Sequence, residues 1–105
     1  MSFDFSKILN NTNKGRGNEA MLLDWLRYNK DREFGSHEIQ LDVVLWIRKT
    51  FNKTVTPDTI SRLWRKMREE LKDDKYNSSL FKAGLSVKEI TKTKSNQKFY
   101  EVTDE

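Results

Sequence analysis

The sequence predicts an α+β fold in which three helices are followed by a β-hairpin. Apolar residues recur at helical spacing in three successive segments. The C-terminal part instead holds two runs that are rich in β-branched and aromatic residues and lack that spacing, as strands do. At 105 residues, the chain is long enough for one small domain. The helices are expected at about 19–30, 36–50 and 57–72, and the strands at 85–93 and 98–103, with a turn at 94–97.

The first helix is expected to follow Asn18, whose side chain can cap it, and to be broken by residues 31–35. Residues 1–17 are expected to form an N-terminal arm or linker, which leaves 18–105 as the folded domain. The inner side of the helix carries Met21, Leu22, Trp25 and Leu26.

The second helix is expected to be the most deeply buried. Ser36 can cap its start, and apolar residues surround most of its circumference. Asn52 tolerates left-handed dihedral angles and can end it. Because the third helix follows after only a few residues, the two form a helix-turn-helix candidate.

The third helix carries the clearest start signal in the chain. Thr56 can cap it, and Pro57 suits the first helical position, where no amide donor is needed. Its core-facing stripe consists of Ile60, Leu63, Trp64, Met67 and Leu71. Each helix has one tryptophan, and Trp25, Trp46 and Trp64 are expected in the core rather than as stacking platforms for bases.

The opposite face of the third helix is polar and cationic, and small hydroxyl residues lie near its start. A helix of this kind suits the major groove of DNA. The alternative is an ordinary solvated surface, with i,i+4 pairs at Asp58–Arg62, Arg65–Glu69 and Lys66–Glu70. The polar face carries Thr59, Ser61, Arg62, Arg65 and Lys66.

Positive charge also gathers in the hairpin. The whole chain has a net charge of +4, and residues 86–98 hold four lysines against the single acid Glu89. Such clustering favours contact with a polyanion. Lysines on an edge strand also prevent aggregation, which is the alternative. The four are Lys88, Lys92, Lys94 and Lys98.

The N-terminal segment leaves two questions open. Lys14 and Arg16 lie in an Asn- and Gly-containing stretch that reads as a flexible linker, with a minor-groove arm as the alternative. Ahead of it, Phe3, Phe5, Ile8 and Leu9 either cover the domain's own core or dock on a second copy.

Enzymatic and metal sites are not expected. His37 is the only histidine, and position 41, where a metalloprotease helix would carry its second histidine, is Leu. Pro57-Asp58 and Glu70-Leu71-Lys72 imitate a nuclease signature, but on one helix they lie about 18 Å apart and cannot share a metal. No small-molecule cofactor is indicated. The chain has no cysteine, no apolar run of membrane-spanning length and no signal-peptide pattern, so a cytoplasmic or nucleoid-associated location is expected.

Three helices followed by a hairpin resemble the winged helix-turn-helix family. The resemblance covers about residues 18–103 and is carried by Ser36-His37-Glu38-Ile39 and by Thr56-Pro57-Asp58-Thr59-Ile60-Ser61-Arg62. It implies a three-helix bundle with a helix-turn-helix and a C-terminal β-hairpin wing. It also implies that residues 57–72 are the recognition helix and that residues 91–98 are a wing tip on phosphate or minor groove.

We therefore expect a non-catalytic protein that binds double-stranded DNA, either a small transcriptional regulator or a replication-associated protein, and homodimerisation is compatible with this. The alternative is a protein-interaction or dimerisation module of the same fold. The expected DNA-binding residues are Thr56, Thr59, Ser61, Arg62 and Lys66 at the groove, Arg65 on phosphate, and Lys92, Lys94 and Lys98 on flanking phosphates.

Overall fold

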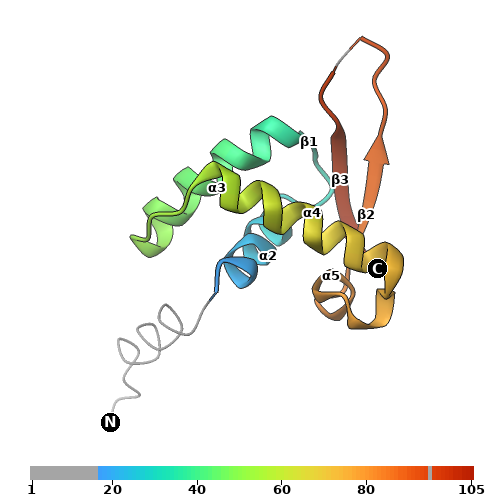
Figure 1. Cartoon of the computed structure of the whole chain (residues 1–105), viewed down its shortest axis with the longest axis horizontal. Helices are drawn as coiled ribbons and strands as arrows, with labels where there is room; N and C mark the ends of the chain where they lie inside the picture. Colours follow the sequence, from blue (N-terminus) through green and yellow to red (C-terminus); the bar gives the residue numbers. More distant parts are fainter. Residues whose placement is uncertain (1–16, 95) are drawn as a thin grey trace.

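The computed structural model describes residues 17–94 and 96–105 and has an α+β architecture (Figure 1). Helices pack together on one side of a small antiparallel sheet, and the hairpin extends beyond them. The elements are α2 (Asn18–Tyr28), β1 (Glu33–Gly35), α3 (Ser36–Phe51), α4 (Pro57–Asp73), the 3-10 turn η1 (Lys75–Asn77), α5 (Ser79–Lys82), β2 (Leu85–Ile90) and β3 (Phe99–Asp104).

The sheet has the strand order β1-β3-β2, with β3 antiparallel to both neighbours. The expectation that residues 31–35 only interrupt the helices was incomplete, because Glu33–Gly35 form β1. Asp31 has a left-handed φ of 64° and donates its amide to the Val102 carbonyl at 2.7 Å, which guides the chain into this pairing. A segment of three residues is too short to show the alternation of apolar and polar residues that marks a strand. Only its pairing with β3 identifies β1 as one.

An aromatic cluster lies where the sheet meets the helices. Phe34 of β1 contacts Trp25 of α2, Trp64 of α4 and Tyr100 of β3, with ring centroids 5.3, 5.7 and 6.2 Å apart. All four side chains are at most 2% exposed. The core expectation is therefore confirmed for Trp25 and Trp64. Trp46 is only half-buried, between the rings of Tyr28 and Phe51.

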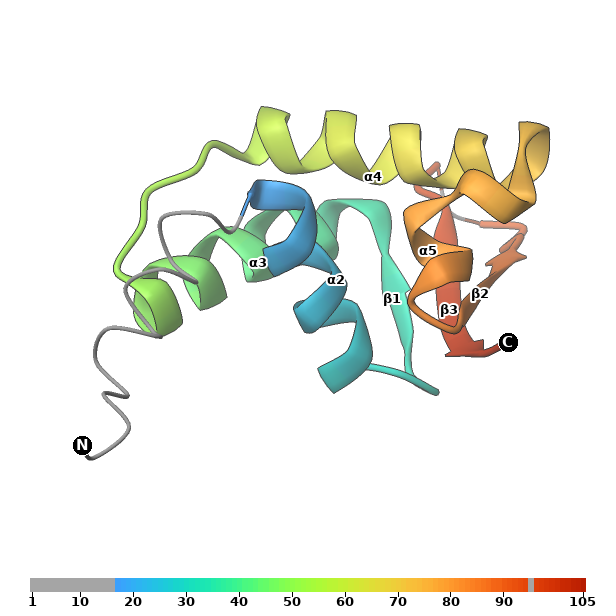
Figure 2. The same cartoon turned by 90° about the horizontal axis from the view of Figure 1, so that it is seen from below.

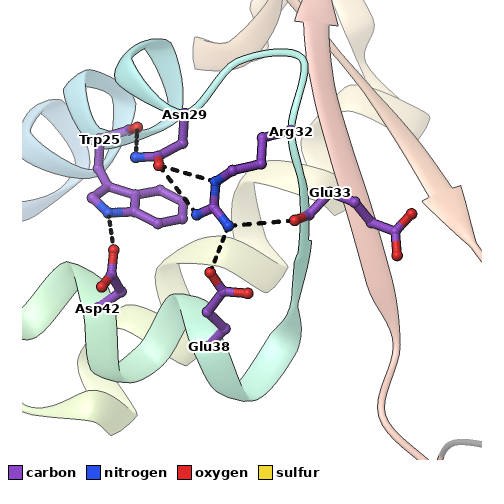
Figure 3. Close-up of polar contacts among 6 residues, drawn as sticks. All are labelled: Trp25, Asn29, Arg32, Glu33, Glu38 and Asp42. Carbon is purple, nitrogen blue, oxygen red and sulfur yellow. Dashed lines mark hydrogen bonds and ion pairs between the residues drawn. The ribbon is translucent and has the colours of Figure 1, made fainter.

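A polar network joins α2, β1 and α3 on one flank (Figure 3). The Trp25 indole donates to Asp42 at 2.9 Å, and the Arg32 guanidinium reaches Asn29 and Glu38, the latter at 2.7 Å. Arg32 also lies over the Trp25 ring, 5.9 Å from its centroid. On this flank, therefore, the arginine is neutralised within the domain.

Two expectations for α2 and α3 were wrong at their starts. The N-cap positions are Gly17 and Gly35, so Asn18 and Ser36 are the first helical residues and neither side chain caps its helix. The first helix also ends at Tyr28, two residues earlier than expected. At the other end of α3, Asn52 has the left-handed conformation that was predicted.

The prediction that the second helix is the most buried was wrong. Its inner face is fully buried through Ile39, Val43 and Ile47, but Leu41 and Leu45 are 61% and 66% exposed. Only one face of α3 meets α2 and α4 (Figure 2). Apolar residues surround most of α3, but other elements cover only one of its faces, so the apolar residues on the opposite face stay exposed.

Helix α4 confirms its predicted start and stripe. The Thr56 hydroxyl accepts from the Thr59 amide at 3.2 Å, and Pro57 is the first helical residue. Ile60, Trp64 and Met67 are buried, and Leu63 and Leu71 pack at the edge of the core. The hairpin strands are displaced slightly, because β2 ends at Ile90 rather than 93 and β3 covers Phe99–Asp104 rather than 98–103. Among the described residues, no helix has the length and apolarity needed to cross a membrane.

Candidate nucleic-acid interface

A polar groove of about 470 Å³ lies between the start of α3, the middle of α4 and the loop that joins β2 to β3, which we call the wing. Its α4 wall is a single stripe at i, i+4, i+7 and i+11, formed by Ser61, Arg65, Arg68 and Lys72. The α3 wall consists of Ser36, His37 and Gln40, and the wing wall of Asn96, Gln97 and Lys98. Three elements that are distant in sequence thus share one concave surface.

The wing is fixed to the first turn of α3 by two hydrogen bonds. The Ser36 amide donates to the Lys98 carbonyl, and the His37 amide donates to Gln97 Oε1, each at 2.9 Å. These amides have no intrahelical partner, so the wing acts as the cap of α3. Gly35 permits this close approach, because a Cβ at that position would lie 2.3 Å from Gln97 Oε1. The position of the wing against the start of α3 is therefore set by the fold.

Arg68 and Tyr100 line the groove together. Its guanidinium carbon lies 4.7 Å from the Tyr100 ring centroid and 5.4 Å from that of Trp64. Burial raises the pKa of the Tyr100 hydroxyl, and the neighbouring Arg68 charge partly offsets this increase. The Arg68 side chain is half-buried, and no carboxylate of the described residues forms a salt bridge with it.

The groove has an excess of positive charge. Arg65, Arg68, Lys72 and Lys98 line it, against the single carboxylate of Glu69. Lys98 also lies 3.5 Å from Glu89 across the hairpin, but both side chains are well exposed. Exposed pairs of this kind are worth about 0.2–1 kcal/mol and exchange readily for another anion.

The predicted site residues on α4 fall on two flanks of the helix. Ser61 and Arg65 face the groove, whereas Thr59, Arg62 and Lys66 line a second cleft beside the start of α2. Arg62 pairs with Asp58 at 3.1 Å, as the solvated-surface alternative proposed. Lys66 instead pairs with Glu19 of α2, at 3.5 Å. Among the described residues, the pairs Arg65–Glu69 and Lys66–Glu70 do not form.

Thr56 and the wing lysines, which are the remaining predicted residues, differ in the contacts that they make within the domain. The Thr56 hydroxyl caps α4 and also lies 2.9 Å from the Thr59 hydroxyl. Lys92 pairs with Glu33 of β1, and its ammonium lies 4.2 Å from the Phe99 ring centroid. Lys94 is exposed at the tip of the wing. Of the three wing lysines predicted to contact DNA, Lys98 lines the groove, whereas Lys92 and Lys94 do not.

Sequence reasoning missed Arg68, Lys72 and the wing amides Asn96 and Gln97. The helical spacing from Arg65 to Arg68 and Lys72 was a usable signal for the first two. No local pattern indicated that Gln97 would bind the backbone of α3. The expectations for Phe3, Phe5, Ile8, Leu9, Lys14 and Arg16 lie outside the described residues.

In comparisons with known proteins, no family model, curated protein or solved structure matches this chain.

Proposed function

We propose that this protein is a winged helix-turn-helix domain that binds double-stranded DNA without catalysis. The element order and the β1-β3-β2 sheet support the fold, with α3 and α4 as the helix-turn-helix and the β2–β3 hairpin as the wing. The link between the two helices is residues 52–56 only. A helix-turn-helix of this kind places its second helix in the major groove.

The cationic groove is the observation that carries the proposal. It joins α4 and the wing, the two elements that would contact neighbouring parts of a duplex, into one positive surface. Ser61 and Arg65 would lie at the base edges and the adjoining phosphate, and Lys98 on a flanking phosphate. To contact DNA, three other α4 residues would first have to break interactions within the domain: Thr59 with Thr56, Arg62 with Asp58, and Lys66 with Glu19.

The biological role that fits best is that of a small transcriptional regulator or a replication-associated DNA-binding protein in the cytoplasm or nucleoid. We propose no enzymatic step for this groove, although His37 and Glu69 line it together with the cations and amides. Sequence preference would come from the residues of α4 that reach base edges.

Fluorescence anisotropy with random-sequence duplex DNA tests this function. We expect binding that falls steeply between about 50 and about 200 mM salt, because each neutralised phosphate releases counterions. Absence of binding at the lower salt concentration would contradict the proposal.

A second candidate function, self-association, is favoured by the exposed face of α3. Glu38, Leu41, Leu45 and Arg48 are spaced by three, four and three residues, as along the seam of a helix pair. Two copies packed antiparallel would oppose their leucines and place Glu38 against Arg48 of the partner subunit. This charge pattern selects a second copy as the occupant.

Charge exchange tests this self-association by sedimentation at high protein concentration. Glu38→Arg and Arg48→Glu are each expected to be monomeric, and their equimolar mixture is expected to recover the dimer. Melting curves of both variants serve as the folding control, since Glu38 also binds Arg32. A wild-type protein that remains monomeric, or a mixture that does, rules this arrangement out.

A further inference from the structure

Arg68 combines a fixed position with an unneutralised charge. Its guanidinium is held against Tyr100 and Trp64, so its direction is set before any ligand arrives. Its Nε is buried and has no hydrogen-bond partner within the described residues. A buried donor that lacks an acceptor has a free-energy cost, so the polar groups of Arg68 are incompletely satisfied within the domain.

Most of the other arginines and lysines predicted as site residues differ from Arg68, although Arg65 and Lys94 also have no salt bridge within the described residues. Arg62, Lys66, Lys92 and Lys98 each have a carboxylate partner in the described part of the chain. The carboxylates nearest to Arg68 along the cavity walls are Glu69, in the groove, and Glu89, in a small cavity on its other side. Neither forms a salt bridge with Arg68, and Glu89 is engaged by Lys98.

The surroundings of Arg68 suit a tetrahedral oxyanion. A guanidinium presents a planar fork of donors that binds two oxygens of a phosphate at once. Arg65 and Lys98 line the same groove and supply two more positive charges, and Ser61 supplies a hydroxyl donor.

We propose that Arg68 is a preformed seat for one phosphate group, with Arg65 and Lys98 completing the site at its rim. The assignment of this phosphate to the DNA backbone rests on the proposed function. A phosphate seated between α4 and the wing would fix the rotational position of the recognition helix on the duplex, because phosphate contacts set the register of a protein on DNA.

The test compares the wild type, Arg68→Met and the control Lys82→Met, which removes one exposed charge on α5. Melting temperatures are measured in sodium phosphate and in sodium chloride of equal ionic strength. Phosphate stabilises folded proteins in general, so the decisive quantity is the difference between variants. We expect phosphate to raise the melting temperature of the wild type and of Lys82→Met by a few degrees more than that of Arg68→Met.

The stability of Arg68→Met in chloride separates a ligand seat from a structural role. Met packs well against aromatic rings and removes the unneutralised charge, so this variant is expected to melt at or above the wild-type temperature. A large fall in melting temperature with an unchanged phosphate response would overturn the proposal. An equal phosphate response in all three proteins would overturn it as well.

DNA titrations distinguish the source of the phosphate. If the wild type binds duplex DNA, Arg68→Met is expected to bind all sequences about tenfold more weakly and to show a salt slope smaller by about 1. Arg68→Lys, which keeps the charge but loses the fork, should fall between the two. Unchanged DNA affinity in Arg68→Met would overturn the backbone assignment. If the wild type binds no DNA but its phosphate response depends on Arg68, the seat is supported and only the DNA function fails.

Discussion

Replacing Arg65 and Lys98 together with alanine is expected to weaken duplex DNA binding by about 10- to 100-fold at about 0.1 M salt. Both side chains line the groove between α4 and the wing, and neither has a buried structural role. Each lost phosphate contact removes roughly one released counterion, so the slope of log K against log salt should decrease by about 2. The measurement is anisotropy over a series of salt concentrations, with wild type and variant on the same duplex.

The matched control for this pair is Lys49→Ala combined with Lys82→Ala. It removes the same two charges from exposed positions on α3 and α5, away from the groove. Net charge alone therefore predicts equal losses for the two double variants, whereas a contact surface in the groove predicts a loss only for the first. Equal losses would refute the placement of the interface, although not DNA binding itself.

Phe34→Ala is expected to lower the free energy of unfolding by about 3–5 kcal/mol, a large part of the stability of a domain of this size. Phe34 is 1% exposed and contacts rings from α2, α4 and β3, so its removal leaves a cavity where the helices meet the sheet. Urea denaturation measures the effect. Phe34→Leu, which fills part of the cavity, provides a second point if the alanine variant does not fold.

Phe81→Ala is the comparison for Phe34→Ala. Phe81 is half-buried on α5 and contacts the exposed Tyr76 edge-on and the Lys75 ammonium, so its loss should cost clearly less. Similar losses for the two alanine variants would show that β1 is not part of the cooperative core. Such a result would also weaken the account of how the wing is anchored, because Gly35 follows Phe34 directly on that strand.

Helix α4 shows how much of this fold was predictable from local sequence. Its cap, its first residue and its buried stripe all follow from side chains within the helix or one position before it, and all three were confirmed. The hairpin was predictable for a similar reason, since strand-forming residues flank a short polar turn. Signals of this kind act over a few residues, so they can be recognised without knowledge of the tertiary structure.

The capping of α3 shows why other features were not predictable. Its first amides are bound by Lys98 and Gln97, about sixty residues later in the chain. The outward direction of Leu41 and Leu45 likewise depends on which faces of α3 other elements cover. Ser36 was a reasonable cap by local rules, but the wing supplies the acceptors in its place.

The same division applies to the candidate site. Ser61, Arg65 and Lys98 were identified from local charge and helix position, and the structure brings them to one groove. Arg68 was missed, because its significance comes from rings on two elements and from the absence of a nearby salt bridge within the described residues. Lys66 and Lys92 were predicted to contact DNA, and their carboxylate partners in the structure, Glu19 and Glu33, are both far away in sequence.

The sequence by itself determined the α+β composition, the position and polarity of α4, and the gathering of positive charge on α4 and in the hairpin. Tertiary structure decided which cations are neutralised, which helix face stays exposed and where the wing lies against α4. The physical reason is the separation along the chain between the residues that interact. Caps, helical spacing and turn preferences act between neighbouring residues, whereas salt bridges, ring contacts and strand pairing depend on residues that only the folded chain brings together.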